Sequence, residues 1–405
     1  MRLLLMLTAS FPLGSGEDFI SAELGSAFGF DRILVCPCSP KPGSVQTREL
    51  PGGVECRPVP KKAAGAAAYP AALLLPGVAA ELFRLLFTGR LTAGKAHELL
   101  YFAKNAREIY RGLKASDFAR GADDVVVYSY WFYDAAFAGA LYARDLRRRN
   151  IRSVCVSRAH GFDIHSERAK YGYLPMRRFL FRHVDRIYPC SQDGAGCLIR
   201  ESPRHASNVQ VSYLGTRDGG VAPCRREPFH AVSCAYMVPV KRLSLILDAL
   251  KETDFPVVWT HIGSGPLEGE LRGRARDLPA QVSAEFAGQM ENAKIPEYYR
   301  ENGVSVFLNV SSSEGIPVSV MEACSCGIPV IATDVGGTGE IVKDGVNGFL
   351  LPADFSPRDL VEKLRLLRSM KEEDYGRLCE SSRRIWEEKF SAEKNFRRFY
   401  EVIGK

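Results

Sequence analysis

The chain of 405 residues is 46% apolar and 25% charged, and its 36 glycines and 23 prolines are scattered. These values predict a globular protein of two domains and exclude collagen-like and extensively disordered chains. The net charge of +7 comes from residues 1–215, whose 29 lysines and arginines against 19 acidic residues suit an anionic partner such as phospholipid, nucleic acid or a phosphorylated substrate.

The cysteines and the apolar runs bear on where the protein is located. None of the 11 cysteines forms a C-x-x-C pair, which favours reduced thiols in a cytoplasmic protein. The start, MRLLLMLTASFP, predicts a strand and a turn rather than a signal peptide, because Pro12 follows a short apolar run. No run reaches the ~18 apolar residues that span a bilayer.

In the first half of the chain, short β-rich runs alternate with helical stretches, which is the pattern of a parallel sheet covered by helices. The predicted strands are RLLLMLTA, RILVCPC, VVVYSYW, IRSVCVSRAHG and DRIYPCS. The predicted helices cover residues 18–28, 79–113, 134–149, 175–183 and 194–200. A turn-rich segment, YLGTRDGGVAPCRREPFH, then separates the halves.

The second half repeats this βα rhythm. Its predicted strands are HAVSCAYM, VVWTHIG, VSAEFAG, VSVFLNVS, PVIATDV and GFLL. Its predicted helices cover residues 244–250, 266–276, 295–302, 316–326, 338–342 and 357–403. We therefore expect an α/β fold of two Rossmann-like, doubly wound domains that face each other across a cleft, with ligands at the carboxyl ends of the strands.

The expected domains are residues 1–215 and 216–385, and residues 386–405 are expected to form a helix that can return to the first domain.

Two glutamates, Glu314 and Glu322, stand eight positions apart in SSSEGIPVSVMEACSCG. On one helix this spacing places both carboxylates on nearly the same face, roughly 12 Å apart, where they could hold hydroxyls at two ends of a polyol ligand. The alternative is that Glu314 is an N-terminal helix charge and Glu322 a solvated position. The apolar neighbours of Glu322 favour a buried carboxylate that needs partners. The glycines of GGTGE, residues 336–340, allow close backbone approach to a phosphate.

The stretch SSSEGIPVSVMEACSCGIPVIATDVGGTGEIVKDGVNGFLL resembles the donor site of the retaining glycosyltransferases of family 4, which have the GT-B fold. Upstream, MVPVKRLSLILDAL and HIGSGPLEGEL resemble other segments of that site, so the likeness covers residues 229–352. It implies that the first domain binds the acceptor and the second the nucleotide sugar.

By position, the resemblance implies that Glu314 binds the donor sugar, Glu322 the ribose and Lys241 the diphosphate, with Lys241 and Glu314 also catalytic. It adds four donor-binding residues to this set: Gly263, Gly315, Ile316 and Val318. One position departs from the family, because Tyr236 stands where an arginine is usual. Arg242 could supply that cation, although adjacent residues on a helix point about 100° apart.

In the first half, SRAHGFDIHSER ends a predicted strand at the expected cleft. The family has a histidine there that contacts the donor sugar, so we expect a catalytic role for His160 and an acceptor role for Asp163. A metal triad of His160, Asp163 and His165 is the alternative. The sequence contains no Asp-x-Asp pair, and we expect neither a metal nor a cofactor, because Lys and Arg can neutralise a leaving diphosphate.

The loop SFPLGSGEDFISAEL follows the first strand. Gly14 and Gly16 would let it approach the donor, and Glu17 would contact the acceptor before a helix that starts at Asp18. A plain turn with a helix cap explains the same residues equally well.

Basic residues and an apolar stretch, residues 71–87, could form a patch that contacts an anionic membrane, although an ordinary solvated face explains the charges as well. We expect no nucleic-acid partner, because no aromatic-basic reading motif occurs. The basic residues are Lys61, Lys62, Arg147, Arg148, Arg149, Arg152, Arg177, Arg178, Arg182 and Arg186.

The predicted function is transfer of a hexose-type sugar from a nucleotide sugar to a glycan or lipid-linked glycan, with retention, in bacterial surface-polysaccharide synthesis. The expected location is the cytoplasm or the inner face of the cytoplasmic membrane. The alternatives are a nucleotide-sugar epimerase of the same fold and a non-catalytic nucleotide-sugar-binding protein.

Overall fold

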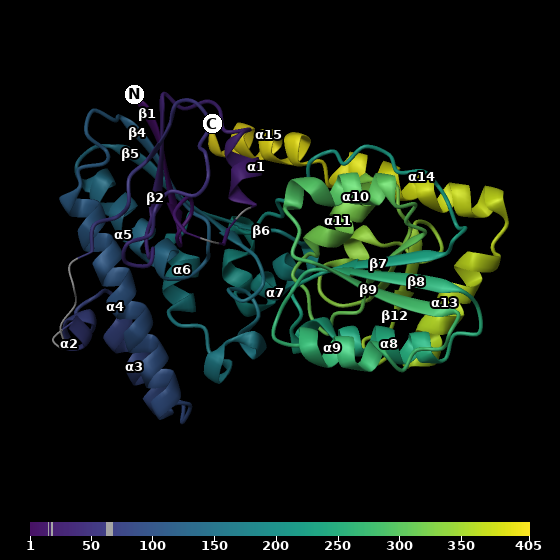
Figure 1. Cartoon of the computed structure of the whole chain (residues 1–405). Helices are drawn as coiled ribbons and strands as arrows, with labels where there is room; N and C mark the ends of the chain where they lie inside the picture. The colour runs from purple at the N-terminus through teal and green to yellow at the C-terminus, as the bar shows by residue number, and fades with distance from the viewer. Residues whose placement is uncertain (15, 18, 62–67) are drawn as a thin grey trace. The chain divides into compact units, whose positions relative to one another are not determined.

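The computed structural model describes residues 1–405 except 15, 18 and 62–67, so the predicted helix start at Asp18 and the basic residue Lys62 lie outside the described residues. The chain forms two compact units, Met1–Ser212 with Phe396–Lys405, and Tyr213–Asn395 (Figure 1). The expected junctions, after residues 215 and 385, differ from these unit limits by three and ten positions.

The first unit is built on a six-stranded parallel sheet with the order β3-β2-β1-β4-β5-β6. The five predicted strands are all present, and the additional strand β3 is short and half-buried. The strands are β1 (Arg2–Thr8), β2 (Arg32–Pro37), β3 (Val54–Cys56), β4 (Asp124–Ser129), β5 (Arg152–Ala159) and β6 (Arg186–Pro189).

Helices cover both faces of this sheet, so its central strand is apolar along its length. Leu3, Leu5 and Leu7 of β1 pack into the core beneath α4 and α5, whereas Leu4 and Met6 face a second cluster that includes α1 and the end of α15. The helices are α1 (Ile20–Leu24), α2 (Ala68–Ala72), α3 (Val78–Phe87), α4 (Ala93–Ala115), α5 (Asp134–Arg148), α6 (Arg177–His183) and α7 (Gln192–Glu201).

The predicted helix over residues 79–113 is two helices in the structure. Helix α3 ends before Thr88, and Gly89 adopts a φ of 65°. Helix α4 starts afresh at Ala93, where the Thr92 side chain accepts a hydrogen bond from the Lys95 amide. An N-cap and a left-handed glycine therefore break a stretch that periodicity alone joins.

A buried ion pair and its neighbours link four elements of the first unit, α1, β4, β5 and α15. Arg158 on β5 and Glu23 on α1 are both fully buried, with Nε and Oε2 3.1 Å apart. The Tyr128 hydroxyl donates to Glu23 at 2.7 Å, and the guanidinium lies 4.2 Å from the ring centroid of Phe399. Phe399 belongs to α15 (Ala392–Ile403), so the last residues of the described chain complete this core.

The second unit is also built on a six-stranded parallel sheet, with the order β12-β11-β10-β7-β8-β9. Its central strand β10 is fully buried, whereas β9 alternates buried with less buried positions, as suits the edge of a sheet. The strands are β7 (His230–Cys234), β8 (Val257–Ile262), β9 (Val282–Gly288), β10 (Val306–Asn309), β11 (Val330–Thr333) and β12 (Gly348–Leu351).

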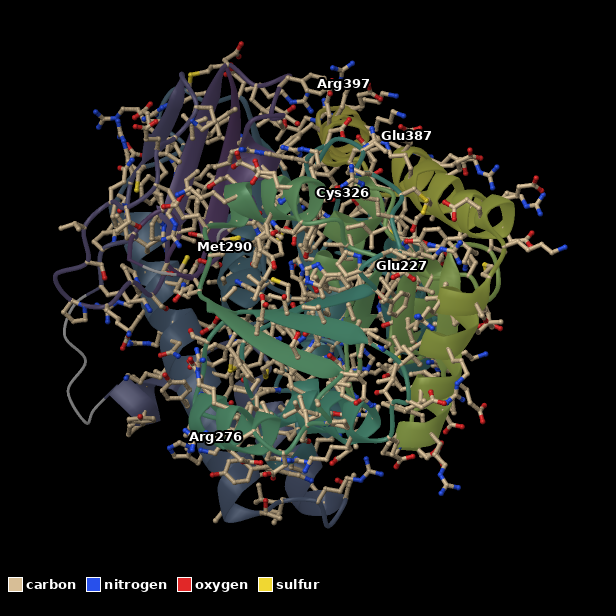
Figure 2. The ribbon with its side chains drawn as sticks, turned by 45° about the vertical axis from the view of Figure 1, so that its right-hand side comes forward. Glu227, Arg276, Met290, Cys326, Glu387 and Arg397 are labelled. Atoms are coloured by element: carbon tan, nitrogen blue, oxygen red, sulfur yellow. The ribbon has the colours of Figure 1, made fainter. Side chains whose placement is uncertain are left out.

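In the second unit, helices alternate with the strands along the chain. Cys326, which is labelled in Figure 2, marks the turn from α11 to β11. The predicted helix over residues 357–403 is three helices, and the first opens with a capping box between Ser356 and Asp359. The helices are α8 (Leu243–Lys251), α9 (Glu268–Ala275), α10 (Ile295–Glu301), α11 (Val318–Ser325), α12 (Thr338–Ile341), α13 (Pro357–Ser369) and α14 (Glu372–Lys389).

Both sheets reverse their strand order, at β1/β4 in the first unit and at β7/β10 in the second. Sheets of this kind bind ligands beside the carboxyl ends of the strands at that reversal. The expected pair of doubly wound α/β domains is therefore confirmed. Among the helices that the structure describes, none combines the length and apolar character needed to cross a bilayer.

Candidate functional site

The loop after β7 carries Lys241 at the carboxyl edge of the second sheet. Gly263 and Gly265, in the loop after β8, have φ of 140° and 156°, and a Cβ on Gly263 would lie 2.0 Å from the carbonyl oxygen of Ala235. The Met237 amide also donates to the Ser264 carbonyl at 2.8 Å. The lack of a side chain at Gly263 thus lets the loop after β8 pack closely against the loop after β7, which carries Lys241.

Lys241 and Glu314 form the centre of this edge. Lys241 Nζ donates to Glu314 Oε1 at 2.7 Å, and Asn309 Nδ2 donates to the same oxygen at 3.3 Å. The side chains of Lys241 and Glu314 are 26% and 11% exposed, so a ligand can still reach the pair. The Lys241 ammonium and the Asn309 amide can donate hydrogen bonds to phosphate oxygens and hydroxyls, and the Glu314 carboxylate can accept them from hydroxyls.

The turn that holds Glu314 is fixed by the loop after β11. The Gly337 amide donates to the Gly315 carbonyl at 2.8 Å, and a Cβ on Gly336, which has a φ of 55°, would lie 2.0 Å from the Glu314 carbonyl oxygen. Gly315 and Ile316 lie between this loop and α11, whose first residue is Val318.

Glu314 precedes α11, so the interpretation that one helix presents Glu314 and Glu322 on the same face was wrong. Residues 312–317 form a turn, and Pro317 directly precedes the helix. The 3.6-residue periodicity applies only within a helix and therefore cannot relate the two carboxylates. Their positions come instead from β10, the turn and α11 together.

Glu322 is a buried carboxyl, as its apolar neighbours predict. It is 6% exposed and accepts a hydrogen bond from Asn292 Nδ2 at 2.9 Å. Burial raises its pKa to about 7, and the Asn292 hydrogen bond opposes that rise. A carboxyl in this state gains from ligand hydroxyls that donate to it, because they offset its desolvation.

Arg242 lies beside Lys241 in the chain but is occupied differently. Its backbone is left-handed, with a φ of 47°, and its guanidinium donates to the carbonyls of Val310, Ser311 and Ala353 and to the Thr333 hydroxyl at 2.7–3.2 Å. These contacts hold the segment after β10 in place. The structure therefore shows Arg242 as an anchor of the loop that leads to Glu314, rather than as a cation directed outward.

In the first unit, His160 follows β5 and lies in an aromatic cluster. Its ring is stacked on Tyr130 at 4.8 Å and lies 4.7 Å from Trp131, and Nε2–H donates to the Tyr130 carbonyl at 3.1 Å. Burial lowers its pKa to about 3, and the charge of Arg158 adds to that effect. His160 is therefore a neutral imidazole near pH 7, with Nδ1 as an acceptor.

Asp163 and Glu17, both predicted to contact an acceptor, already bind backbone amides. Asp163 is fully buried and accepts from the amides of Phe132, His160 and Gly161 at 2.8–3.1 Å. Glu17 accepts from the amides of Ala9, Ser10 and Phe11 and from the Trp131 indole. Both carboxylates thus shape loops at the carboxyl edge of the first sheet, a role that residue type alone does not reveal.

Gly16 lies in the same loop as Glu17 and has a φ of 100°. A Cβ at this position would meet nothing within 4 Å, so the backbone angle rather than close packing favours glycine here. The Gly16 carbonyl accepts a hydrogen bond from Arg48 at 3.1 Å, which ties the loop to the segment after β2.

Sequence reasoning missed several polar and aromatic residues of these two edges. Asn309, five positions before Glu314, and Asn292, thirty positions before Glu322, hold the two glutamates of the second unit. In the first unit, Trp131 packs on Phe162 at 4.9 Å, and Phe162 is 50% exposed. The aromatic run YSYWFYD was the available signal, since flat apolar rings suit the faces of sugars.

Within the described part of the chain, one group of side chains is close enough to hold a metal ion. The ligand atoms of His165, Asp193 and Cys197 lie within 4.8 Å of one another. Arg200 donates to the Cys197 sulfur at 3.2 Å, which opposes the binding of a cation there. The alternative triad of His160, Asp163 and His165 is not formed, because amides occupy the Asp163 carboxylate.

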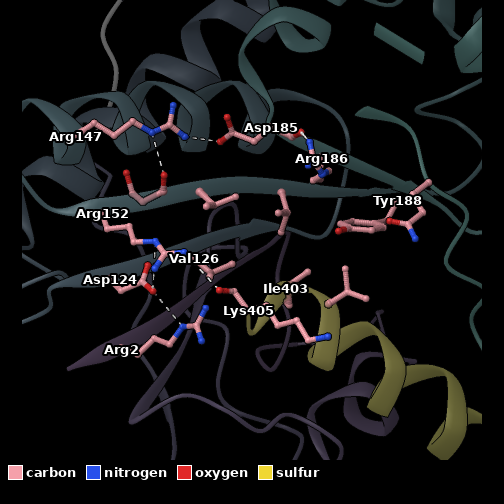
Figure 3. A pocket seen from close by; sticks show the side chains of 15 residues that line it. Arg2, Asp124, Val126, Arg147, Arg152, Asp185, Arg186, Tyr188, Ile403 and Lys405 are labelled. Carbon is pink, nitrogen blue, oxygen red and sulfur yellow. Dashed lines mark hydrogen bonds and ion pairs between the residues drawn. The ribbon is translucent and has the colours of Figure 1, made fainter. Parts of the chain in front are cut away.

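Most of the predicted basic patch is neutralised by acidic partners. Arg147 pairs with Asp185, and Arg152 lies 4.0 Å from Asp124, around a pocket of about 620 Å³ (Figure 3). Asp124 and Arg152 begin β4 and β5, so this pocket lies at the amino ends of the strands, away from the ligand-binding edge. Arg177 is buried against Glu201. These residues do not form a continuous cationic surface.

The chain shares its fold with solved structures of known proteins. The chain superimposes over its whole length on the UDP complex of Alr3699/HepE from Anabaena, with a TM-score of 0.67, 16% identity and 99% of that chain covered. This likeness shows the fold, which is the GT-B fold of two Rossmann-like domains. Residues 224–384 match the family model "Glycosyl transferases group 1".

Two curated relatives are named for bacterial polysaccharides. WcaL of Escherichia coli K12, named for colanic acid biosynthesis, is 27% identical over 266 residues, which are 63% of this chain and 65% of the relative. The amylovoran biosynthesis glycosyltransferase AmsK of Erwinia amylovora is 23% identical over 286 residues, which are 66% and 68% of the two chains. The chain spans 46% to 65% of the length of the first three relatives.

Proposed function

We propose that the protein is a retaining glycosyltransferase that moves a hexose-type sugar from a nucleotide sugar to a glycan or lipid-linked glycan during bacterial surface-polysaccharide synthesis. The observation that carries the proposal is the contact of Lys241 with Glu314 at the strand reversal of the stretch that matches the glycosyltransferase group 1 model. The names of WcaL and AmsK support the polysaccharide role, and the UDP in Alr3699/HepE supports a nucleotide donor. The acceptor would be reached from the cytoplasm, at the inner face of the membrane.

In this proposal the second unit holds the donor. Lys241 neutralises charge on the diphosphate as the glycosidic bond breaks, while Glu314 accepts hydrogen bonds from sugar hydroxyls. Asn309 fixes the Glu314 carboxylate, and Glu322 accepts from the ribose hydroxyls. Backbone amides close to the sugar and the phosphates come from Gly315, Ile316 and Val318. Pro317 has no backbone N–H and cannot donate.

The first unit supplies His160, a neutral imidazole whose Nδ1 can accept a hydrogen bond from the donor sugar. The aromatic rings around it present apolar faces on which a sugar can stack. Gly16 lets the loop after β1 approach the donor. Asp163 and Glu17 act by holding their loops, which refines the acceptor contacts that the sequence predicts for them.

Retention requires that the acceptor attack the face from which the nucleoside diphosphate leaves. The acceptor oxygen forms the new bond to the anomeric carbon, the bond to the diphosphate breaks, and the leaving phosphate oxygen takes the acceptor proton. We propose no metal and no cofactor, since Lys241 meets the charge of the leaving group. Nor does this route need the carboxylate pair of a glycosidase.

The test is a screen of nucleotide sugars with polysaccharide-repeat acceptors, read by nucleoside diphosphate release and by product anomer. We expect acceptor-dependent release with one donor, and Glu314→Ala should abolish turnover while the melting temperature is kept. Epimerised donor formed without an acceptor would instead establish the epimerase. Donor binding without turnover under every acceptor would establish a binding protein.

A further inference from the structure

Helix α3 presents large apolar side chains to solvent. Phe83, Leu86 and Phe87 are 57%, 55% and 84% exposed, whereas Val78 and Leu85 on the opposite side pack into the core. The rings of Phe83 and Phe87 stack at 6.3 Å. Single exposed apolar residues are common, but three large ones within five positions form a ridge that marks a contact surface.

A cationic cavity lies directly beside this ridge. The cavity of about 370 Å³ is formed between α3, which contributes Ala80 and Arg84, and α6, which contributes Arg178 and Arg182. Ala80 stands three positions before Phe83 and Arg84 three positions before Phe87, so the cavity and the ridge occupy adjoining stripes of one helix. Figure 1 shows α3 and α6 in the first unit.

Arg178 and Arg182 differ from the other arginines of the predicted basic patch, each of which has a partner. Neither has a hydrogen-bond or ion-pair partner among the residues that the structure describes, and both are exposed. Arg84, in contrast, is neutralised by the buried Glu81, with NH2 2.6 Å from Oε1. Two uncompensated guanidinium groups therefore flank the apolar ridge, and guanidinium binds phosphate in a bidentate manner.

We propose that α3 and α6 form a docking face for a bilayer of anionic phospholipid. Phe83, Leu86 and Phe87 enter the headgroup–acyl boundary, and Arg178 and Arg182 bind lipid phosphates. An amphipathic helix with a cationic flank has this chemistry, and apolar insertion and charge attraction reinforce each other. The choice of occupant rests on the proposed function, because a lipid-linked acceptor lies in a membrane.

The experiment is flotation of the full chain with vesicles of phosphatidylcholine, alone or with about one third phosphatidylglycerol. We expect wild type to float only with the anionic vesicles. Phe83→Ser/Phe87→Ser and Arg178→Gln/Arg182→Gln should each lower vesicle affinity by about 10- to 30-fold. The control Val45→Ser/Leu366→Ser, which removes exposed apolar residues elsewhere, should float like wild type.

A second readout keeps the test independent of protein folding. Phe87→Trp should show a blue-shifted emission with anionic vesicles, whereas Trp at the exposed Phe28 should not. Equal flotation of wild type and both double variants, flotation with neutral vesicles alone, or an equal loss in the control would overturn the docking face. UDP-induced thermal stabilisation, measured on the same samples without lipid, tests the proposed donor site separately, so either idea can fail alone.

Discussion

At the scale of single residues, Lys241 and Glu314 contact each other, and in the proposed function both also bind the donor. We expect Lys241→Ala to weaken UDP binding and to lower turnover by about 10²- to 10³-fold, because one cation that meets developing charge is lost. The measurement is UDP affinity by calorimetry and turnover by diphosphate release.

Lys251→Ala is the matched control, since this lysine of α8 is partly exposed and lies 3.8 Å from Asp277. It should behave like wild type. Normal turnover in Lys241→Ala would contradict the role assigned to the ammonium group.

Glu322 should make donor binding depend on pH. Its pKa is raised to about 7 by burial, and ribose hydroxyls that donate to the carboxylate favour the ionised form. The pKa is therefore lower in the complex, so affinity is fully present above about pH 7 and falls as the pH drops through that value. UDP affinity should decrease by about tenfold from pH 8 to pH 6.

Glu322→Gln retains the titration of the UDP phosphate but lacks that of the carboxyl. Its binding profile should consequently be flatter than that of wild type. Identical profiles for the two proteins would show that ligand binding does not involve Glu322.

At the scale of elements, the loop after β11 fixes the turn that carries Glu314. Gly336→Ala should destabilise the protein by more than the roughly 1–2 kcal/mol expected for a left-handed alanine, since its Cβ would lie 2.0 Å from the Glu314 carbonyl oxygen. Displacement of that turn should also weaken UDP binding. Urea unfolding and calorimetry measure the two effects.

Gly345→Ala separates backbone strain from close contact. Gly345 also has a positive φ, of 72°, but a Cβ there meets nothing within 4 Å. We expect only the strain cost and unchanged UDP affinity. Equal effects of the two substitutions would mean that the approach of the loop to Glu314 has no special importance.

The buried pair of Arg158 and Glu23 connects α1 with β5. Arg158→Met should cost about 3–5 kcal/mol of unfolding free energy, because it leaves a carboxylate in a fully buried position. Glu23→Leu/Arg158→Met should cost less than Arg158→Met alone, since neither charge remains. Urea unfolding of the four proteins of the cycle measures this coupling, and additive losses would contradict it.

At the scale of the whole molecule, apolar runs and turn residues were enough to predict eleven of the twelve strands and the doubly wound class of both domains. Strand β3 escaped because VEC is short and half-buried. The splits after residues 87, 369 and 389 escaped because the helical pattern continues across each of them. Helix breaks fixed by capping and tertiary packing leave little trace in periodicity.

The candidate site was predictable to a similar degree. Motif spacing led to Glu314 and Glu322, the family resemblance led to Lys241, and the structure places Lys241 and Glu314 in contact. Residue type could not show that Arg242 binds carbonyl oxygens or that Asp163 binds amides, because those partners are backbone atoms brought together only by the fold.

The position of Phe396–Lys405 in the first unit has a consequence for biosynthesis. On the ribosome, Met1–Ser212 emerges early, yet Phe399, Tyr400 and Ile403 of its core arrive only after the whole of Tyr213–Asn395. At about 5–20 residues per second, that delay is roughly 10 to 40 s. During this interval the nascent first unit exposes the apolar face that Phe399, Tyr400 and Ile403 later cover, whereas the second unit has no such wait.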